Sequence, residues 1–393
     1  MSEYGAYIKA WLEHIRVLSE EIGPRGPTTE GERRGSEFFQ RALAGMSIPS
    51  NWESFSSARS IFQPHLLAAI AMLVSFAIYP LAGRSSAILA FIIALAALVS
   101  DLQELSFRNN LLRFVVSKGQ SQNVVATIFP QGEPRQDLVL IGHVDSQRTP
   151  IVFKNTRWLS IYKSFTTIAF VAFALQVILF ALGTVIQANW IWPISIPCAI
   201  CAVLLAAMCI QADLTPFTRG ANDNASAVGL LLTLAEHLKD EPLKNTRVWL
   251  ACTGCEEVQH YGAIDFFARH RTELNNPKVL VFEMLGCAGP AWLVKEGIVI
   301  PFHAEKSMVA LAETLAKEHP ELNAIPASIS GGNTEMADAL RNGIPAITFT
   351  GFGPKGEAPY WHMLEDTYDK MDAEVMARNY AFTWQYIRLI DAI

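Results

Sequence analysis

The sequence is poor in charge and contains no run of basic residues. Lys, Arg, Asp and Glu make up 17% of the 393 residues, and the formal net charge is −6. Nucleic-acid-binding proteins concentrate lysine and arginine on one face, so this composition argues against nucleic acid as a partner. With 51% hydrophobic residues, the chain is also too apolar for a plain soluble enzyme of this size, which favours membrane-spanning segments.

The sequence also lacks the pattern of a cleavable signal peptide and the cysteine spacing of a zinc ribbon. The N-terminal stretch has no basic region followed by an apolar core, so we expect no cleavable signal peptide. The six cysteines include two CxxC spacings, Cys198–Cys201 and Cys252–Cys255, but the first lies in an apolar segment and no second pair stands at metal-binding spacing from it. This spacing argues against a zinc ribbon, and we expect free, reduced thiols.

Two long stretches are almost free of charge. Arg84 is the only charged residue between positions 66 and 100, and there is none between positions 164 and 212. A break divides each stretch, at 82–86 and at 187–193, so the pattern predicts four transmembrane helices arranged as two hairpins. A buried helical hairpin in a soluble core is the alternative for the first stretch, because each of its runs is slightly shorter than the ~20 residues that a span needs.

Elsewhere, strand-like and helix-like segments alternate. Strands are expected at 123–129, 138–141, 247–252, 278–282 and 344–350, and helices at 6–21, 29–44, 226–239, 260–270, 307–318, 337–342 and 373–390. Such alternation predicts an α/β fold in which helices cover an open sheet. One domain would then consist of residues 1–60, 105–157 and 213–393, interrupted by hairpins at 61–104 and 158–212.

Polar residues cluster directly after the expected strands, where sites gather in open α/β sheets. The cluster comprises His143, Asp145, Asp223, Glu256, Glu257, Glu283 and His362. Histidines with carboxylates suit zinc or, less specifically, manganese or cobalt. A carboxylate has two oxygens and can bridge two cations, while a neighbouring carboxylate that binds no metal can accept a proton from water. The adjacent glutamates can divide the roles of base and ligand between them. His260 lies close to this pair, and we expect the remaining histidines to be structural.

Taken together, the motifs resemble the M28 family of zinc aminopeptidases. Their order is HxD, GAxDNA, EE, an acidic residue after a strand, and a late histidine followed by Asp-Thr. The segments HIRVLSEEIGPRGPTTEGE and SQNVVATI resemble that family as well. The resemblance spans nearly all of the chain outside the apolar stretches. It implies a single aminopeptidase-like domain with a mixed central sheet covered by helices.

The resemblance also implies roles for the clustered residues. The ligands of two Zn²⁺ ions would be His143, Asp223, Glu257, Glu283 and His362. The bridging residue would be Asp223, with His143 and Glu283 on one ion and Glu257 and His362 on the other.

In the same resemblance, Glu256 would be the general base and Asp145 would orient His143. The chain departs from the family at Glu283, where M28 members usually have aspartate, although the related M20 family tolerates glutamate there. A second departure is the long insertion between His143 and Asp223, whose ends must return to nearly the same place if both residues are to reach one site.

These features predict a membrane-anchored zinc peptidase that removes N-terminal residues from peptides, with the lipid bilayer as a second partner. A carboxypeptidase, a one-metal glutaminyl cyclase and an inactive receptor or scaffold are the alternatives. Oligomeric state is left open. Lysines and arginines flank the apolar stretches on the side of the α/β domain, while only Arg84 lies in the opposite turns, so the positive-inside rule places the catalytic domain in the cytoplasm.

A reporter fused to the C-terminus tests this orientation. Because four spans place both termini on one side, we expect the reporter to be active only in the cytoplasm. Activity confined to the outer face would contradict the predicted topology.

Overall fold

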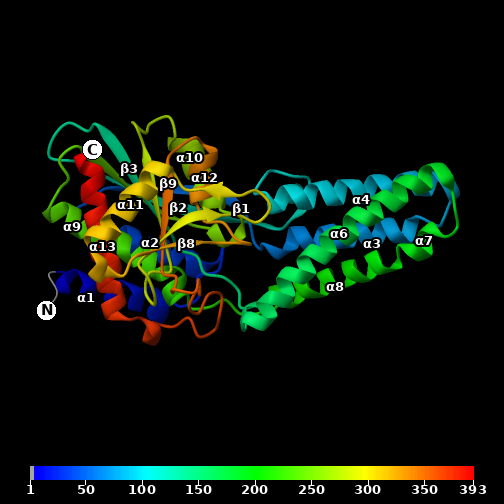
Figure 1. The fold of residues 1–393 in the computed structure, drawn as a ribbon, viewed down its shortest axis with the longest axis horizontal. Helices are drawn as coiled ribbons and strands as arrows, with labels where there is room; N and C mark the ends of the chain where they lie inside the picture. Colours follow the sequence, from blue (N-terminus) through cyan, green and yellow to red (C-terminus); the bar gives the residue numbers. More distant parts are fainter. Residues whose placement is uncertain (1–3) are drawn as a thin grey trace. The chain divides into compact units, whose positions relative to one another are not determined.

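The computed structural model describes residues 4–393, which divide into two compact units. The α/β unit comprises Met1–Ser57, Gly119–Gln147 and Phe217–Ile393, and the helical unit comprises Ala58–Lys118 and Arg148–Pro216. In Figure 1, strands and helices intermingle in the α/β unit, whereas the helical unit consists of long helices packed side by side. Both predicted hairpin ranges fall within the helical unit.

Among the described residues, nine strands form the sheet of the α/β unit, in the order β1-β2-β4-β3-β5-β9-β6-β7, with β8 paired to β6. They are β1 (Ser50–Ala58), β2 (Lys118–Ile128), β3 (Gln136–His143), β4 (Thr246–Thr253), β5 (Lys278–Glu283), β6 (Ala291–Glu296), β7 (Phe302–His303), β8 (Ile325–Ser328) and β9 (Ala346–Thr350).

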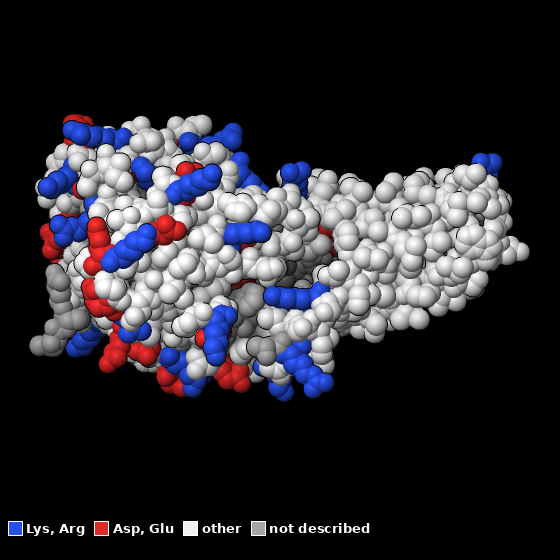
Figure 2. Space-filling model, in the orientation of Figure 1, with Lys and Arg blue, Asp and Glu red and all other residues white. Residues whose placement is uncertain are grey.

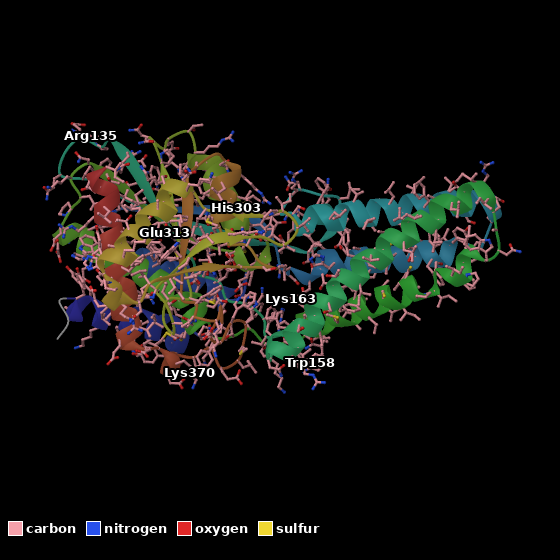
Figure 3. All side chains as sticks on the ribbon, viewed as in Figure 1. Arg135, Trp158, Lys163, His303, Glu313 and Lys370 are labelled. Atoms are coloured by element: carbon pink, nitrogen blue, oxygen red, sulfur yellow. The ribbon has the colours of Figure 1, made fainter. Side chains whose placement is uncertain are left out.

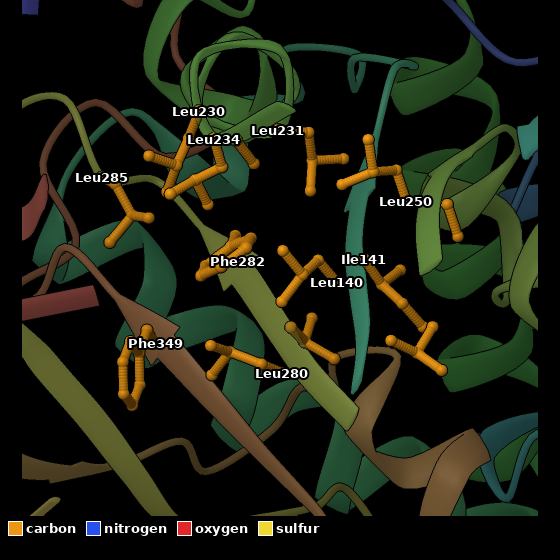
Figure 4. Close-up of a cluster of buried hydrophobic side chains, with 14 of the residues drawn as sticks. Leu140, Ile141, Leu230, Leu231, Leu234, Leu250, Leu280, Phe282, Leu285 and Phe349 are labelled. Atoms are coloured by element: carbon orange, nitrogen blue, oxygen red, sulfur yellow. The ribbon is translucent and has the colours of Figure 1, made fainter. Parts of the chain in front are cut away.

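The centre of this sheet is parallel and its flanks contain antiparallel pairs. Strand β3 pairs in parallel with β4 and β5, and β5 with β9, whereas β2 and β6 join as antiparallel neighbours of β4 and β9. Every residue of β3 is buried, as expected for a parallel strand with both faces covered. The predicted α/β class with a mixed central sheet is therefore confirmed. Figure 4 shows the apolar side chains that β3, β5 and β9 contribute to the core.

Helices cover both faces of the sheet. They are α1 (Gly5–Arg16), α2 (Glu30–Gly45), α9 (Ser226–Asp240), α10 (Tyr261–His270), α11 (Lys306–Glu318), α12 (Met336–Arg341) and α13 (Ala373–Ala392). A Cβ at Gly142 would lie 2.9 Å from Ala227 of α9, whereas Trp249 makes an edge contact with Phe266 of α10. Because Gly142 and Trp249 occupy positions of opposite parity in the β3–β4 register, α9 and α10 lie on opposite faces.

The helical unit is a bundle of four apolar helices. The four long helices are α3 (Phe62–Ile78), α4 (Gly83–Leu105), α6 (Thr156–Ile186) and α8 (Ile196–Asp213), and two helices of four residues, α5 (Leu112–Val115) and α7 (Ile191–Ile194), lie between them along the chain. Small side chains such as Ala68, Ala90 and Ala94 let α3 and α4 approach closely, and Phe173 and Phe180 of α6 fill the interior. Trp158 and Lys163 lie in the first turns of α6 (Figure 3).

The outside of this bundle is as apolar as its interior. Ile92, Val171, Ile178 and Val185 are all exposed, and the visible face of the bundle is nearly free of charged residues (Figure 2). By length and composition, α4, α8 and residues 157–186 of α6 could each cross a membrane. Helix α3 is equally apolar but has only 17 residues, and is thus shorter than the ~20 that a span needs.

The helical unit is inserted into the α/β unit at two places. At the second place, the backbone N–H of Thr218 donates to the carbonyl of Gln147 over 2.9 Å, and both residues belong to the α/β unit. Within the helical unit, Thr149 N–H likewise donates to Pro216 O over 3.0 Å. The long insertion between His143 and Asp223 therefore leaves and returns at adjacent points of the backbone, as the sequence requires.

Core packing around β3 can be tested with Val139→Ala. Val139 is fully buried, so loss of two methyl groups should lower the free energy of unfolding by about 2 kcal/mol. The matched control is Val299→Ala, since Val299 is 48% exposed and its truncation leaves no cavity. Equal effects in thermal or denaturant unfolding of the two variants would contradict the assigned core.

Candidate active site

The predicted site residues come together at the carboxyl ends of the central strands. His143 ends β3 and Glu283 ends β5, while Glu256 and Glu257 form the short helical turn η4 (Glu256–Val258) after β4. Asp223 lies in the turn η3 (Ala221–Ala225) before α9. The last member, His362, lies in the loop that follows β9, and all six side chains are buried. Parallel strands with this register necessarily bring their C-terminal residues to one edge.

Asp223 lies between the two histidines. Its Oδ1 is 3.5 Å from His143 Nε2, and its Oδ2 is 3.4 Å from His362 Nε2. A second carboxylate accompanies each imidazole: Glu283 Oε2 lies 3.5 Å from His143 Nε2, and Glu257 Oε2 lies 3.2 Å from His362 Nε2. Each half therefore offers one nitrogen and two carboxylate oxygens, with Asp223 common to both.

This donor set fits metal cations. In each half, the candidate ligand atoms lie within 4.8 Å of one another, close enough to converge on one ion. Among the described residues, Oε1 of Glu257 and Oε1 of Glu283 are buried without a hydrogen-bond partner. Buried carboxylate oxygens normally have a partner, and a cation would provide one. Imidazole nitrogens combined with carboxylate oxygens are typical zinc ligands.

Burial and proximity shift the pKa values of the acidic groups. Burial raises the pKa of Glu257 to about 7, and it raises that of Glu283 well above its usual range. Burial also acts to raise the pKa of Glu256, but His143 and His260 outweigh this effect and lower it to about 2. Glu256 is therefore ionised at neutral pH, as a proton acceptor must be.

Two aspartates hold the loops that carry these residues. The carboxylate of Asp145 accepts the backbone N–H groups of Glu256 at 3.1 Å and Glu257 at 3.0 Å. Asp145 also faces His143 Nδ1, through its carbonyl oxygen at 3.1 Å and its Oδ1 at 3.5 Å. The sequence predicted that the Asp145 carboxylate orients His143. In the structure, both this carboxylate and the Asp145 carbonyl oxygen face the His143 ring.

Asp366 performs the equivalent task for the Asp223 loop. Its carboxylate accepts the backbone N–H groups of Asn222 at 2.6 Å and Asp223 at 3.0 Å. The side-chain amide of Asn224 donates to Glu283 Oε2 over 2.9 Å, which links the same loop to the end of β5. Sequence reasoning assigned no role to Asp366, although its place after the late histidine was part of the resemblance.

Arg25 is another residue that sequence reasoning missed. Its guanidinium is fully buried and donates to the carbonyl oxygens of Val144, Gly220 and three further residues, thereby joining the β3 end to the Asp223 loop. Burial lowers its pKa to about 10, so it stays charged at neutral pH. The only signal in the sequence was an arginine between Pro24 and Gly26.

Comparison with known proteins agrees with this geometry. Residues 208–387 match the model of peptidase family M28, which confirms the predicted resemblance. No curated protein matches the chain.

Solved structures with similar folds include enzymes of two classes. A glutaminyl cyclase from Tannerella forsythia has 14% identity and a TM-score of 0.57, with 97% of this chain and 98% of that chain covered. A leucine aminopeptidase precursor from Bacteroides thetaiotaomicron has 11% identity and a TM-score of 0.57, with 97% and 96% covered. A zinc aminopeptidase from Bacillus subtilis has 13% identity and a TM-score of 0.57, with 98% and 95% covered. At such identities the likeness shows the fold.

A pH-dependent stability test follows from Glu296, a buried residue of β6 beside the site. Thr334 Oγ1 donates to its Oε2 over 2.8 Å, and burial raises its pKa from 4.5 to about 8. The folded protein therefore holds this proton up to about pH 8, whereas the unfolded chain loses it near pH 4.5. Stability contributed by this group is complete below pH 4.5 and is lost as the pH rises to about 8.

Glu296→Gln keeps an oxygen for Thr334 and removes the titration. We expect the melting temperature of this variant to fall less than that of the wild type when the pH is raised across that window. The exposed Glu318→Gln serves as control and should follow the wild type. If the melting temperatures of wild type and Glu296→Gln changed equally with pH, the Glu296 carboxyl group would not titrate within that pH window.

Proposed function

From the premise that residues 208–387 carry the M28 peptidase pattern, we propose that the protein is a metallopeptidase, and specifically an aminopeptidase. The observation that supports this most is the position of Asp223 between two imidazoles, each with a second carboxylate. The arrangement offers places for two cations that share one bridging carboxylate. Zinc is the cation that this donor set suits best, and manganese or cobalt are compatible with it.

In this proposal, His143 and Glu283 would hold one cation, His362 and Glu257 would hold the other, and Asp223 would be shared between the two sites. Bound there, the cations would polarise the scissile carbonyl of a peptide and lower the pKa of a water. The peptide is the partner on which this function depends.

Glu256 is the group that moves the proton. Its Oε2 lies 3.8 Å from His143 Nε2, so the carboxylate faces the space between the candidate ligands. Glu256 also offers an oxygen within 4.8 Å of ligand atoms of His143 and Glu257, but it belongs to neither of the two sets that contain Asp223. It accepts a proton from the attacking water and returns it to the leaving amine nitrogen as the C–N bond breaks. Asp145 fixes the backbone of Glu256 during these transfers.

Glutaminyl cyclase activity is the second candidate function, because the solved structures with a similar fold include a glutaminyl cyclase. Both reactions begin at a free N-terminal amine but end differently. A peptidase consumes water and releases an amino acid, whereas a cyclase acts on an N-terminal glutamine and releases ammonia.

We also propose that the helical unit anchors the protein in a lipid bilayer, with the catalytic unit in the cytoplasm. The apolar exterior of the bundle supports the anchoring, because water would solvate such a surface poorly. The distribution of lysine and arginine along the sequence supports the orientation.

Glu256→Gln tests the peptidase proposal. The variant keeps the shape of the side chain but no proton acceptor of carboxylate strength, so we expect kcat on a free-amine peptide to fall by about 10² to 10⁴-fold. Zinc content should be unchanged, and a chelator should abolish the wild-type activity until zinc is restored. Purified protein, an amino-acid release assay and metal analysis provide these measurements.

The matched control is Glu313→Gln on the exposed face of α11, which should retain wild-type kcat. An N-acetylated peptide should resist cleavage if the enzyme is an aminopeptidase, and ammonia release from an N-terminal glutamine would favour the cyclase instead. Full activity in Glu256→Gln would remove this residue from the proposed chemistry.

A further inference from the structure

His260 bridges the proposed base to a carboxylate on another helix. It directly precedes α10 and is almost completely buried. Its Nε2 lies 3.1 Å from Glu256 Oε1, and its Nδ1 lies 2.6 Å from Asp338 Oδ2. Asp338 belongs to α12 and is equally buried. The three side chains therefore form a continuous chain from α12 to the base.

The proton count in this chain is constrained. Carboxylate oxygens only accept hydrogen bonds, and both ring nitrogens of His260 face a carboxylate oxygen. A neutral imidazole has one N–H and would leave its second nitrogen lone pair against an oxygen lone pair. Both contacts are satisfied when the ring carries two N–H groups, which gives a positive imidazolium between two negative carboxylates.

The surroundings favour that charge. Burial acts to lower the pKa of His260, but Asp338 and Glu256 outweigh it and raise the pKa well above its usual value. Two more buried carboxyls lie nearby, Glu296 and Glu335, and burial raises the pKa of each to about 8. Both are mainly protonated at neutral pH and therefore add little negative charge beside Glu256.

We propose that His260, held by Asp338, is a positioning residue that fixes the Glu256 carboxylate for proton transfer. With Oε1 bound to His260, Oε2 is left to face His143 and the candidate cation positions. The inference rests on the proposed role of Glu256 as base. Without the imidazolium, Glu256 would lose a charge-assisted hydrogen bond and would repel the carboxylates of Asp223 and Glu283 with no compensating positive neighbour on its other side.

His260→Gln is the decisive variant, because glutamine can donate to Glu256 but cannot bridge both carboxylates or carry charge. We expect kcat to fall by about 10- to 100-fold, with KM and zinc stoichiometry unchanged. Asp338→Asn should lose less, since the asparagine oxygen still accepts the Nδ1–H. In a Glu256→Gln background, His260→Gln should cost nothing further, because the group that it positions is already disabled.

His270→Gln provides a matched control at the other end of α10. His270 also lies between two carboxylates, with Nε2 2.8 Å from Glu53 Oε1 and Nδ1 3.3 Å from Glu273 Oε2. Its partners are not site residues, so the variant should lose thermal stability but keep kcat. If His260 were merely structural, His260→Gln would behave like His270→Gln and lose thermal stability without a loss of kcat.

Metal-free protein gives an independent readout. With ¹⁵N-labelled histidine, we expect two protonated ring nitrogens for His260 at neutral pH and an altered Nε2 resonance in Glu256→Gln. The inference would be overturned if His260 carried a single N–H, or if its Nε2 resonance were the same in the wild type and in Glu256→Gln. Wild-type protein that hydrolyses no peptide after zinc loading would refute the proposed function, whereas active protein in which His260→Gln retains full kcat would refute the inference alone.

Discussion

Mutual repulsion between carboxylates buried in one place is the constraint on which the α/β unit depends. Asp223, Glu256, Glu257 and Glu283 all lie at one edge of the sheet, shielded from water. Like charges in such surroundings raise each other's pKa and cost stability unless they are compensated. The imidazoles of His143 and His362 lie between these carboxylates. Oε1 of Glu257 and Oε1 of Glu283 are buried without a hydrogen-bond partner, and cations would be suitable partners for them.

The same constraint explains how the ligand-bearing loops are held. Asp145 and Asp366 each accept two consecutive backbone N–H groups, one pair at Glu256 and Glu257 and the other at Asn222 and Asp223. Backbone N–H groups thus satisfy these buried carboxyl oxygens without further cationic side chains. Arg25 contributes the one fully buried guanidinium described beside these loops, and it binds carbonyl oxygens rather than the carboxylates.

The central strands and the clustered residues were predictable because both leave local patterns. Continuous apolar runs marked β3 and β5, and polar residues at their ends marked the site. Strand β1 was missed since its exposed positions carry only asparagine and serine, residues that are typical of loops. Some contacts could not be predicted because the partners lie far apart along the chain. The separation is 195 residues for Arg25 and Gly220, 144 for Asp366 and Asn222, and 78 for His260 and Asp338.

The hydrogen bond between Gln147 and Thr218 bears on how such a chain could arise. Because the insertion leaves and re-enters at neighbouring backbone atoms, a turn of a few residues could close the gap in its place. The register of β3 with β4 and β5 is set entirely by residues outside the insertion. A segment that encodes residues 148–216 could therefore be gained or lost here without a change in the register of these three strands.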